Sequence, residues 1–465
     1  MYILQVPNEP ITRNESQMPL YIATKTCLQK LVRQVQDHSR RCQTSLVARR
    51  IQRRGHVALV EYTCQHSGRA RHKFWWASSP RMPNGKYLAN ERVLHGLVFS
   101  GMRPSHYTRF VNGANLGMIE KRVRRSFVKN HLPSLEAEYE ESTENALQLE
   151  IGMTMEDPDT WQGIDVCTDA RHGHRRNAKD TSMVAIGNKT KKVLRHIHIT
   201  KARDHVTQRH ELIGVKDFYE YMDTKDTPVR IHVHDRNMAV NAHVKKLNGP
   251  INQNDRWHGI KSLKKAIESV GGGRKRDHGK TWHCQLEDKC EPIGTHAHWA
   301  IDQCQGDADT LRRLLRGVVD HYSNFHNNCP PASRCQTDPR YEPSRIVLWD
   351  PMAKTLLCNA IVKSTLYRGA EDFVHGMNTS HVESFNNVMN MYHDKRIYYS
   401  DEEYLARSYI SVLYWNENSG REFTSTWQPP VGAGSSRGSS MKRNYKPATY
   451  FFQRNVWQRY FSSLA

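Results

Sequence analysis

Three successive runs near the middle of the chain are rich in apolar and β-branched residues, which is the pattern of β-strands. The runs cover 163–170, 181–187 and 192–200, and only short turns separate them. Consecutive strands joined by short turns predict an antiparallel meander.

The next elements alternate between helix and strand. Apolar residues at helical spacing predict a helix over 210–222, and period-two alternation predicts a strand over 228–235. Helical patterns follow at 237–247 and 255–270, with only a polar turn between them. The order β-β-β-α-β-α predicts an α/β fold.

A glycine-rich break at 271–273 separates this segment from a long helical insertion, which includes a helix over 309–326. The last strongly patterned helix begins near residue 379. Its apolar positions recur at helical spacing and predict one buried face, formed by Val382, Phe385, Met389 and Tyr392. Thr379 or Ser380 is placed to cap this helix.

The ends of the chain carry weaker signals. Several cysteines and histidines surround a strand-like run at 56–64 and suggest a small zinc-stapled or β-rich module; they are Cys42, His56, Cys64, His66 and His72. Residues 117–151 have a helical pattern. Near the C-terminus, 427–443 has the composition of a flexible linker, and 450–461 has the aromatic content of a docked helix, a candidate dimer interface.

These patterns divide the chain into six segments. We expect a mixed N-terminal module with a DNA-binding role at 1–110, a helical linker at 111–160, the first part of the α/β domain at 161–270, the helical insertion at 271–375, the final helices of the α/β domain at 376–425, and a linker with the aromatic segment at 426–465.

Composition narrows the class of partner. The 465 residues include 68 Lys and Arg against 47 Asp and Glu, so the formal charge is +21. Clustered cations gain affinity by releasing counterions from a phosphate backbone, which predicts a polyanionic partner such as double-stranded DNA. The alternative is a basic surface that serves solubility alone. The ten cysteines are irregularly spaced and argue against a secreted disulfide scaffold.

The sequence also bears on location. The first residues lack a signal-peptide pattern, and no apolar run reaches the length of a membrane span. We therefore expect a soluble intracellular protein without a membrane partner.

Three acids fall where the predicted elements converge. Asp169 lies near the end of the first strand, Asp235 at the end of the fourth, and Glu383 in the first turns of the late helix. Side chains at such strand ends project into an open crevice. Carboxylates there hold hard cations such as Mg²⁺. A pair of bound Mg²⁺ ions supports in-line displacement at phosphorus. The alternative for each acid is a turn or cap residue.

Four segments together resemble a known family. They are TDARHGHRRNA (168–178), IHVHDRNMAVN (231–241), NDRWHGIKSLKK (254–265) and NTSHVESFNNVMNMYHDKR (378–396). Over about 161–420 the chain resembles the DDE/DDD cut-and-paste DNA transposases, especially eukaryotic Kolobok-like and Mutator-like elements and host proteins derived from them. Asp255 and His258 match the [Cys/Asp]-x-x-His element that such proteins carry between the second acid and the insertion.

The resemblance implies an RNase H-like catalytic domain with Asp169, Asp235 and Glu383 as catalytic residues and ligands of Mg²⁺ or Mn²⁺. It further implies DNA strand cleavage and strand transfer at transposon ends, a nuclear location and a homo-oligomer. Two alternatives remain: a domesticated DNA-binding or chromatin protein without activity, and a metal-dependent nuclease without strand transfer.

Two assignments within the site stay open. Asp165 and Asp169 project from the same strand face, and the Asp-Ala-Arg context favours Asp169 as the first acid. His258 either orients DNA or a catalytic carboxylate, or packs beside Trp257 at the start of a helix.

A second cluster has zinc-ligand chemistry. Two imidazoles and two thiolates suit tetrahedral Zn²⁺, and they are supplied by His321, His326, Cys329 and Cys335. The two histidines lie five residues apart within the predicted helix, which aligns them poorly on one face. Competing ligands are Cys284, Cys290, Cys304 and His296, and the alternative is a set of buried reduced cysteines.

Short basic runs flank the predicted site. We expect DNA-phosphate contacts from two of them, through Arg171, Arg175, Arg176, Arg274, Lys275 and Arg276. Similar runs occur at 121–125, 189–192 and 442–446. Any of these runs serves equally well as a nuclear-import signal or a solvated face.

Overall fold

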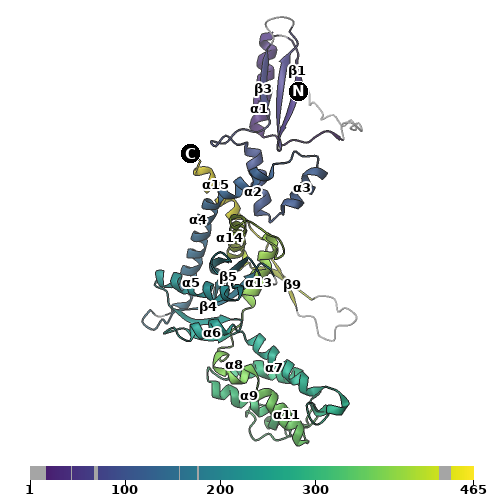
Figure 1. Cartoon of the computed structure of the whole chain (residues 1–465), viewed down its shortest axis with the longest axis vertical. Helices are drawn as coiled ribbons and strands as arrows, with labels where there is room; N and C mark the ends of the chain where they lie inside the picture. The colour runs from purple at the N-terminus through teal and green to yellow at the C-terminus, as the bar shows by residue number, and fades with distance from the viewer. Residues whose placement is uncertain are drawn as a thin grey trace. The chain divides into compact units, whose positions relative to one another are not determined.

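The computed structural model describes residues 17–42, 44–66, 72–156, 158–174, 177–428 and 441–464. The chain forms two compact units with a mixed α/β composition (Figure 1). The first unit combines Met1–Ser142 with Val388–Ala465, and the second is Thr143–Asn387. Within the described residues, none of the helices has the length and apolarity that crossing a membrane would require.

A five-stranded mixed sheet with the order β6-β5-β4-β7-β8 organises the second unit. Its strands are β4 (Ile164–His172), β5 (Asp180–Gly187), β6 (Val193–Thr200), β7 (Val229–His234) and β8 (Ile251–Asn254). The first three pair antiparallel, as the meander pattern predicts. β7 runs parallel to β4, and β8 runs parallel to β7. In the register of β4 and β7, Thr168 pairs with His234.

Helices follow the strands in the predicted order. They are α5 (His210–Thr224), α6 (Met238–Val244) and α7 (Arg256–Gly271). α5 packs on the sheet through Phe218 and Met222, which join Ile164, Val166 and Met183 in one buried apolar cluster. The predicted helix at 210–222 is therefore confirmed, and its apolar residues form the core with the sheet.

One strand escaped the sequence pattern. β8 covers only Ile251–Asn254, a segment that we expected to be a polar turn. Its side chains Asn252, Gln253 and Asn254 are buried although they are polar. Gln253 donates to the Glu371 carbonyl at 2.8 Å, so hydrogen bonds compensate for the burial. A strand of four residues without apolar alternation gives no periodic signal.

The insertion is helical, as expected. It contains α8 (Cys290–Gln303), α9 (Ala308–Tyr322), α10 (Arg334–Thr337), α11 (Pro351–Val362) and α12 (Thr365–Arg368). Ile260, Leu263 and Ile267 of α7 belong to the same apolar core as these helices.

α9 ends four residues before the predicted end at 326. Asn324 adopts a left-handed backbone with a φ of 60°, and the Phe325 N–H donates back to the Asp320 carbonyl at 3.0 Å. This is a common way to terminate a helix. His326 therefore lies in a loop.

The first unit contains a small antiparallel sheet with the order β1-β2-β3, formed by β1 (Leu46–Arg54), β2 (Val57–Cys64) and β3 (Lys73–Ala77). Its helices are α1 (Lys25–Cys42), α2 (Leu88–Phe99), α3 (Pro104–Gly113), α14 (Asp401–Asn418) and α15 (Phe451–Ser462). α4 (Lys121–Thr154) and α13 (Ser380–Tyr392) each begin in one unit and end in the other. All four residues of the predicted apolar face of α13 are buried.

The predicted linker at 427–443 lies partly outside the described residues. Within the described part, its borders form a hairpin, because β9 (Phe423–Trp427) pairs antiparallel with β10 (Lys442–Tyr445). The short, fully exposed strands offer no burial pattern from which sequence could have predicted them.

The aromatic C-terminal segment forms α15, which packs against its own chain. Trp457 and Tyr460 are 5% and 2% exposed. The Tyr460 ring stacks on His131 of α4 with ring centroids 3.5 Å apart. The Arg92 guanidinium lies 3.9 Å from the centroid of the Trp457 ring. These two aromatic side chains therefore stabilise the fold of the first unit, whereas Phe451 and Phe461 of the same segment are exposed.

We predict that Trp457→Ala lowers the free energy of unfolding of the first unit by about 3–5 kcal/mol, because it leaves a large cavity. Chemical denaturation followed by circular dichroism measures the loss. Phe461→Ala on the same helix is the control, since Phe461 is 45% exposed and its removal should cost little. An equal, small effect of both substitutions would contradict the packing described here.

Candidate metal centre

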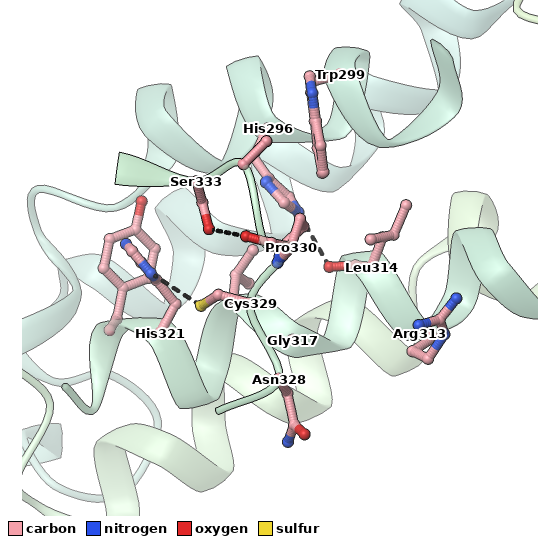
Figure 2. A pocket seen from close by; sticks show the side chains of 13 residues that line it. His296, Trp299, Arg313, Leu314, Gly317, His321, Asn328, Cys329, Pro330 and Ser333 are labelled. Carbon is pink, nitrogen blue, oxygen red and sulfur yellow. Dashed lines mark hydrogen bonds between the residues drawn. The ribbon is translucent and has the colours of Figure 1, made fainter. Parts of the chain in front are cut away.

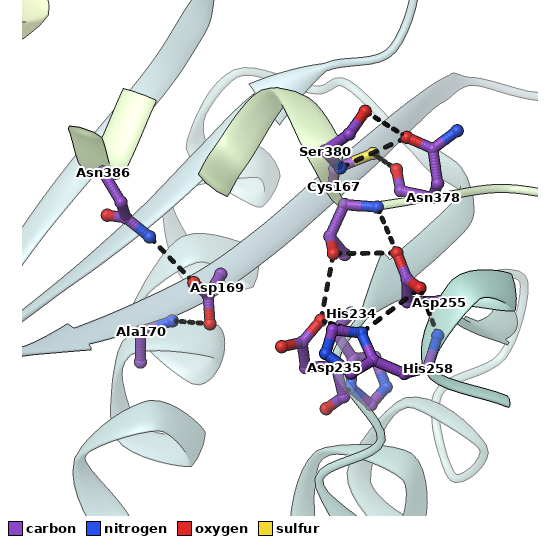
Figure 3. Close-up of polar contacts among 11 residues, drawn as sticks. Cys167, Asp169, Ala170, His234, Asp235, Asp255, His258, Asn378, Ser380 and Asn386 are labelled. Atoms are coloured by element: carbon purple, nitrogen blue, oxygen red, sulfur yellow. Dashed lines mark hydrogen bonds and ion pairs between the residues drawn. The ribbon is translucent and has the colours of Figure 1, made fainter. Parts of the chain in front are cut away.

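Two of the predicted acids come from neighbouring parallel strands: Asp169 lies within β4, next to the position where β7 ends and Asp235 follows (Figure 3). Asp169 follows Thr168 in β4, Asp235 follows His234 at the end of β7, and Thr168 and His234 are register partners. Neighbouring strands lie about 4.8 Å apart. The topology thus places on adjacent strands two acids that are 66 positions apart in the sequence. The ligand atoms that lie within 4.8 Å of one another are those of Asp235, Asp255 and His258, and this group does not include Asp169 or Glu383.

Asp169 is held by neutral donors. Its Oδ1 accepts the Ala170 N–H at 2.8 Å, and its Oδ2 accepts from Asn386 Nδ2 of α13 at 2.8 Å. Burial and the negative charge of Asp235, with a smaller contribution from Glu383, raise the pKa of Asp169 to about 6. Glu383 lies one helical turn before Asn386 and is exposed. The charges of the other two predicted acids therefore both act on Asp169.

Asp235 is positioned by Thr379, which directly precedes α13. Thr379 Oγ1 lies 3.0 Å from Asp235 Oδ1 and 2.9 Å from Asp255 Oδ2. A hydroxyl has one proton, so it donates to only one of these carboxylates at a time. Thr379 therefore links the two carboxylates, and its side chain does not cap α13, which is a correction to one of our two predicted caps.

The Asp-x-x-His element forms the start of α7. Asp255 caps this helix, because its Oδ1 accepts the His258 N–H at 2.9 Å, and its Oδ2 accepts the Thr379 N–H at 2.7 Å. His258 Nδ1 lies 3.2 Å from Asp255 Oδ1 and 3.5 Å from Asp235 Oδ1.

His258 contacts both a carboxylate and Trp257, the two kinds of neighbour that the sequence suggested. Its ring packs edge-on against Trp257, with centroids 5.0 Å apart. The ligand atoms of Asp235, Asp255 and His258 also lie within 4.8 Å of one another, so together they are able to hold a cation.

Sequence reasoning missed a fourth carboxylate, Glu211, in the first turn of α5. Asn237 Nδ2 donates to Glu211 Oε2 at 2.7 Å. Burial raises the pKa of Glu211 to about 7, and the charges of Asp169 and Asp235 contribute in the same direction. In the sequence this residue is one acid at the start of a helix, a frequent position for Glu, so no pattern marked it.

The structure separates Asp165 from Asp169. Asp165 is 2% exposed and accepts two hydrogen bonds from Arg230, at 2.8 Å from Nε and 2.7 Å from Nη2. This bidentate ion pair neutralises Asp165. Asp169 is therefore the acid that shares a site with Asp235.

Buried polar contacts fix the strands beneath the carboxylates. His232 lies between Thr168 and Tyr219, with its Nε2 2.7 Å from Thr168 Oγ1 and its Nδ1 2.9 Å from the Tyr219 hydroxyl. His234 Nε2 lies 3.1 Å from Asn252 Oδ1. Burial lowers the pKa of both histidines, so they are neutral near pH 7.

The second predicted cluster also assembles. All four ligand atoms of His321, His326, Cys329 and Cys335 lie within 4.8 Å of one another. Cys329 Sγ is 3.5 Å from His321 Nδ1 and 3.7 Å from His326 Nδ1. The spacing of five residues between His321 and His326 does not keep them apart, because α9 ends between them and His326 lies in a loop. These residues are able to bind a metal ion.

Two of these residues line a cavity of about 350 Å³ that His296 and Trp299 of α8 also line (Figure 2). Burial, together with the hydrogen bond to Cys335, raises the pKa of Cys329 to about 12. Without a metal this thiol is protonated, and metal binding would release the proton.

The competing ligands have other roles. His296 Nε2 lies 3.0 Å from the Leu314 carbonyl. Cys304 Sγ donates to the Ile301 carbonyl at 3.1 Å, and Cys290 Sγ donates to Glu268 Oε1 at 3.4 Å. Cys284 groups with His278 and His283 instead.

The predicted DNA contacts differ in exposure. Arg274, Lys275 and Arg276 are exposed in a loop after α7. Arg171 is only 2% exposed, so its guanidinium is not available to a phosphate backbone, and its predicted role in DNA binding is wrong. Arg175 and Arg176 lie outside the described residues.

A scan against protein-family models and a search of curated protein sequences both gave no match for this chain. The functional argument therefore depends on the chemistry of the site.

The raised pKa values of Asp169 and Glu211 predict how stability depends on pH. The folded chain holds both protons up to about pH 6–7, whereas the unfolded chain releases them near pH 4. Between these limits the folded state binds more protons, so stability falls as pH rises and stays lower above about pH 7 without a cation.

Glu211→Gln removes one of these charges and keeps a group that Asn237 is able to contact. We expect it to raise the melting temperature above that of wild type near pH 8 in EDTA, with the difference vanishing near pH 4. Mg²⁺ should narrow the difference by stabilising the wild type. Glu220→Gln, an exposed position on the same helix, is the control. A Glu211→Gln protein that melts at or below the wild-type temperature near pH 8 would contradict this account.

Proposed function

We propose that this protein is a divalent-metal-dependent enzyme that cleaves DNA strands and transfers them, with an RNase H-like catalytic domain related to those of DDE transposases. One observation carries the proposal: Asp169 and Asp235 come from adjacent parallel strands, and α13, the helix after the insertion that carries Glu383, contacts Asp169 through Asn386. His258 of the Asp-x-x-His element lies close to the second acid, with its Nδ1 3.5 Å from Asp235 Oδ1.

The topology of the second unit supports this proposal. An antiparallel meander is followed by a helix and a strand parallel to β4, the order expected for such a domain. The first acid lies on the first strand of this sheet, the second follows the fourth, and the third follows the helical insertion.

The residues suit a hard divalent cation. Asp169, Asp235 and Glu383 offer carboxylate oxygens, the ligands that Mg²⁺ and Mn²⁺ prefer. When bound, a pair of such ions activates the attacking oxygen and stabilises the leaving oxygen during displacement at phosphorus. Thr379 and His258 contact the carboxylate of Asp235, and Asn386 holds that of Asp169.

Exposed cations supply a means of binding DNA phosphates. The loop residues Arg274, Lys275 and Arg276 lie in the second unit. In the first unit the edge strand β1 exposes Arg49, Arg50, Arg53 and Arg54. The same proposal places the protein in the nucleus with its substrate and predicts a homo-oligomer.

We predict that affinity for duplex DNA falls steeply with salt concentration, because binding releases counterions. Fluorescence-anisotropy titrations at several salt concentrations give the slope. We plot the logarithm of the DNA association constant against the logarithm of the salt concentration. Replacing Arg49 and Arg54 with Gln should make this negative slope shallower by about 0.9 for each phosphate contact that is lost. Lys363→Gln, which removes a cation in the insertion, is the control. A flat salt response of the wild type would contradict phosphate-dominated binding.

The central test is Asp235→Asn. The amide keeps the size of the side chain but loses the charge that holds a cation, so cleavage of plasmid or labelled duplex DNA with Mg²⁺ should fall roughly 10²-fold or more. DNA affinity and the melting curve should change little. Gel analysis of nicked, linear and joined products measures each step separately.

Asp226→Asn is the matched control. It makes the same charge change before the opposite end of β7, at an exposed position with a φ of 47°, a conformation that Asn tolerates. Cleavage without joined products would favour a nuclease without strand transfer. Equal cleavage by wild type in EDTA and in Mg²⁺, or by Asp235→Asn and wild type, would refute the metal-dependent assignment. No cleavage by any protein would favour the DNA-binding alternative.

A further inference from the structure

A third group of metal-ligand side chains meets in the first unit, at one end of the sheet β1-β2-β3. The ligand atoms of His38, Cys42, Cys64 and His72 all lie within 4.8 Å of one another. Tetrahedral zinc, with bonds of about 2.0–2.3 Å, places its ligands about 3.3–3.8 Å apart. Small side-chain adjustments would therefore close this group around one ion.

The local fold explains why these four residues meet. His38 and Cys42 lie four residues apart, on the same face of the last turn of α1. Cys64 ends β2 and His72 directly precedes β3, and these strands pair antiparallel. The Cys64 N–H donates to the His72 carbonyl at 3.0 Å, and the His72 N–H donates to Cys64 Sγ at 3.1 Å.

The side chains themselves indicate a missing partner. Both ring nitrogens of His38 are buried and have no hydrogen-bond partner within the described part of the chain. Leaving such groups unpaired is costly. Cys42 and Cys64 are free thiols.

We propose that His38, Cys42, Cys64 and His72 bind one structural Zn²⁺. This set corrects the ligands that the sequence suggested around the run at 56–64. His56 is fully buried, and its Nε2 lies 3.0 Å from the Tyr107 hydroxyl. His38 was missed because it lies in a separate helix.

The ion would hold the C-terminal end of α1 against the sheet. At its N-terminal end α1 is tied by the Trp76 indole, which donates to the Cys27 carbonyl at 2.8 Å. Cys27 is the one buried residue of this 18-residue helix, whereas Leu28, Val32 and Val35 are exposed. A module with so little apolar core depends on other links for its stability, and a zinc ion supplies such a link.

The test uses the full chain, purified without chelators and analysed for zinc by mass spectrometry. His72→Ala should contain one zinc per chain less than wild type. His66→Ala is the matched control: His66 is an exposed histidine just after β2 and lies outside the cluster, so zinc content should not change. Equal zinc in His72→Ala and wild type would overturn the proposal, whatever the second cluster binds.

A second measurement applies if His72→Ala does not fold. Wild-type protein is treated with a thiol-alkylating reagent before and after zinc is removed by a chelator, and the labelled peptides are identified. We expect Cys42 and Cys64 to be protected before chelation and labelled after it. Labelling of both thiols before chelation, or a disulfide between them, would overturn the proposal. Neither outcome depends on Mg²⁺-dependent cleavage, so this test and that of the proposed function fail independently.

Discussion

Repulsion between carboxylates is the constraint on which the second unit depends. The sheet places Asp169 beside Asp235, and Glu211 and Glu383 add two further negative charges nearby. Burial removes much of the water that would screen them. Burial, with a smaller contribution from the neighbouring charges, raises the pKa of Asp169 to about 6 and that of Glu211 to about 7, so protonation near neutral pH removes part of the negative charge. A divalent cation would relieve it more completely, because it brings two positive charges to the same place.

The contacts around these carboxylates leave their charge available. Asn386 holds Asp169, Thr379 holds Asp235 and Asn237 holds Glu211, and each of these donors is neutral. Asp165 on the same strand is different, because Arg230 neutralises it through two hydrogen bonds. Neutral donors fix the direction of a carboxylate without cancelling its charge. The acids that lack a cationic partner are thus the ones that converge, which is the arrangement that a cation site requires.

Periodicity predicted much of the fold, and spacing predicted less of the site. The meander and α5 carry clear apolar patterns, so their positions followed from the sequence. β8 is short and polar, and its stability comes from contacts such as that of Gln253 with Glu371, which no local pattern encodes. Likewise Asp255 is recognisable as a helix cap, but its link to Thr379 spans 124 positions and depends on the tertiary fold. Glu211 and His38 were missed for the same reason.

The groups proposed to bind metal differ in ligand chemistry, and this difference sorts the ions. The group around Asp169, Asp235 and Glu383 offers mainly carboxylate oxygens, which suit Mg²⁺ or Mn²⁺. The cluster that contains His38 and the cluster that contains His321 each offer two histidine nitrogens and two cysteine sulfurs, which suit Zn²⁺. The acidic site contains no cysteine, so it offers a zinc ion none of the thiolate ligands that the His/Cys clusters supply. The His/Cys clusters tie helices, strands and loops together, while Asp169 and Asp235 lie on or next to strands of a sheet that is already formed and are held by hydrogen bonds from Asn386 and Thr379. If both proposals hold, loss of zinc would therefore destabilise the structure around the zinc site. Loss of magnesium would stop DNA cleavage while the protein stays folded.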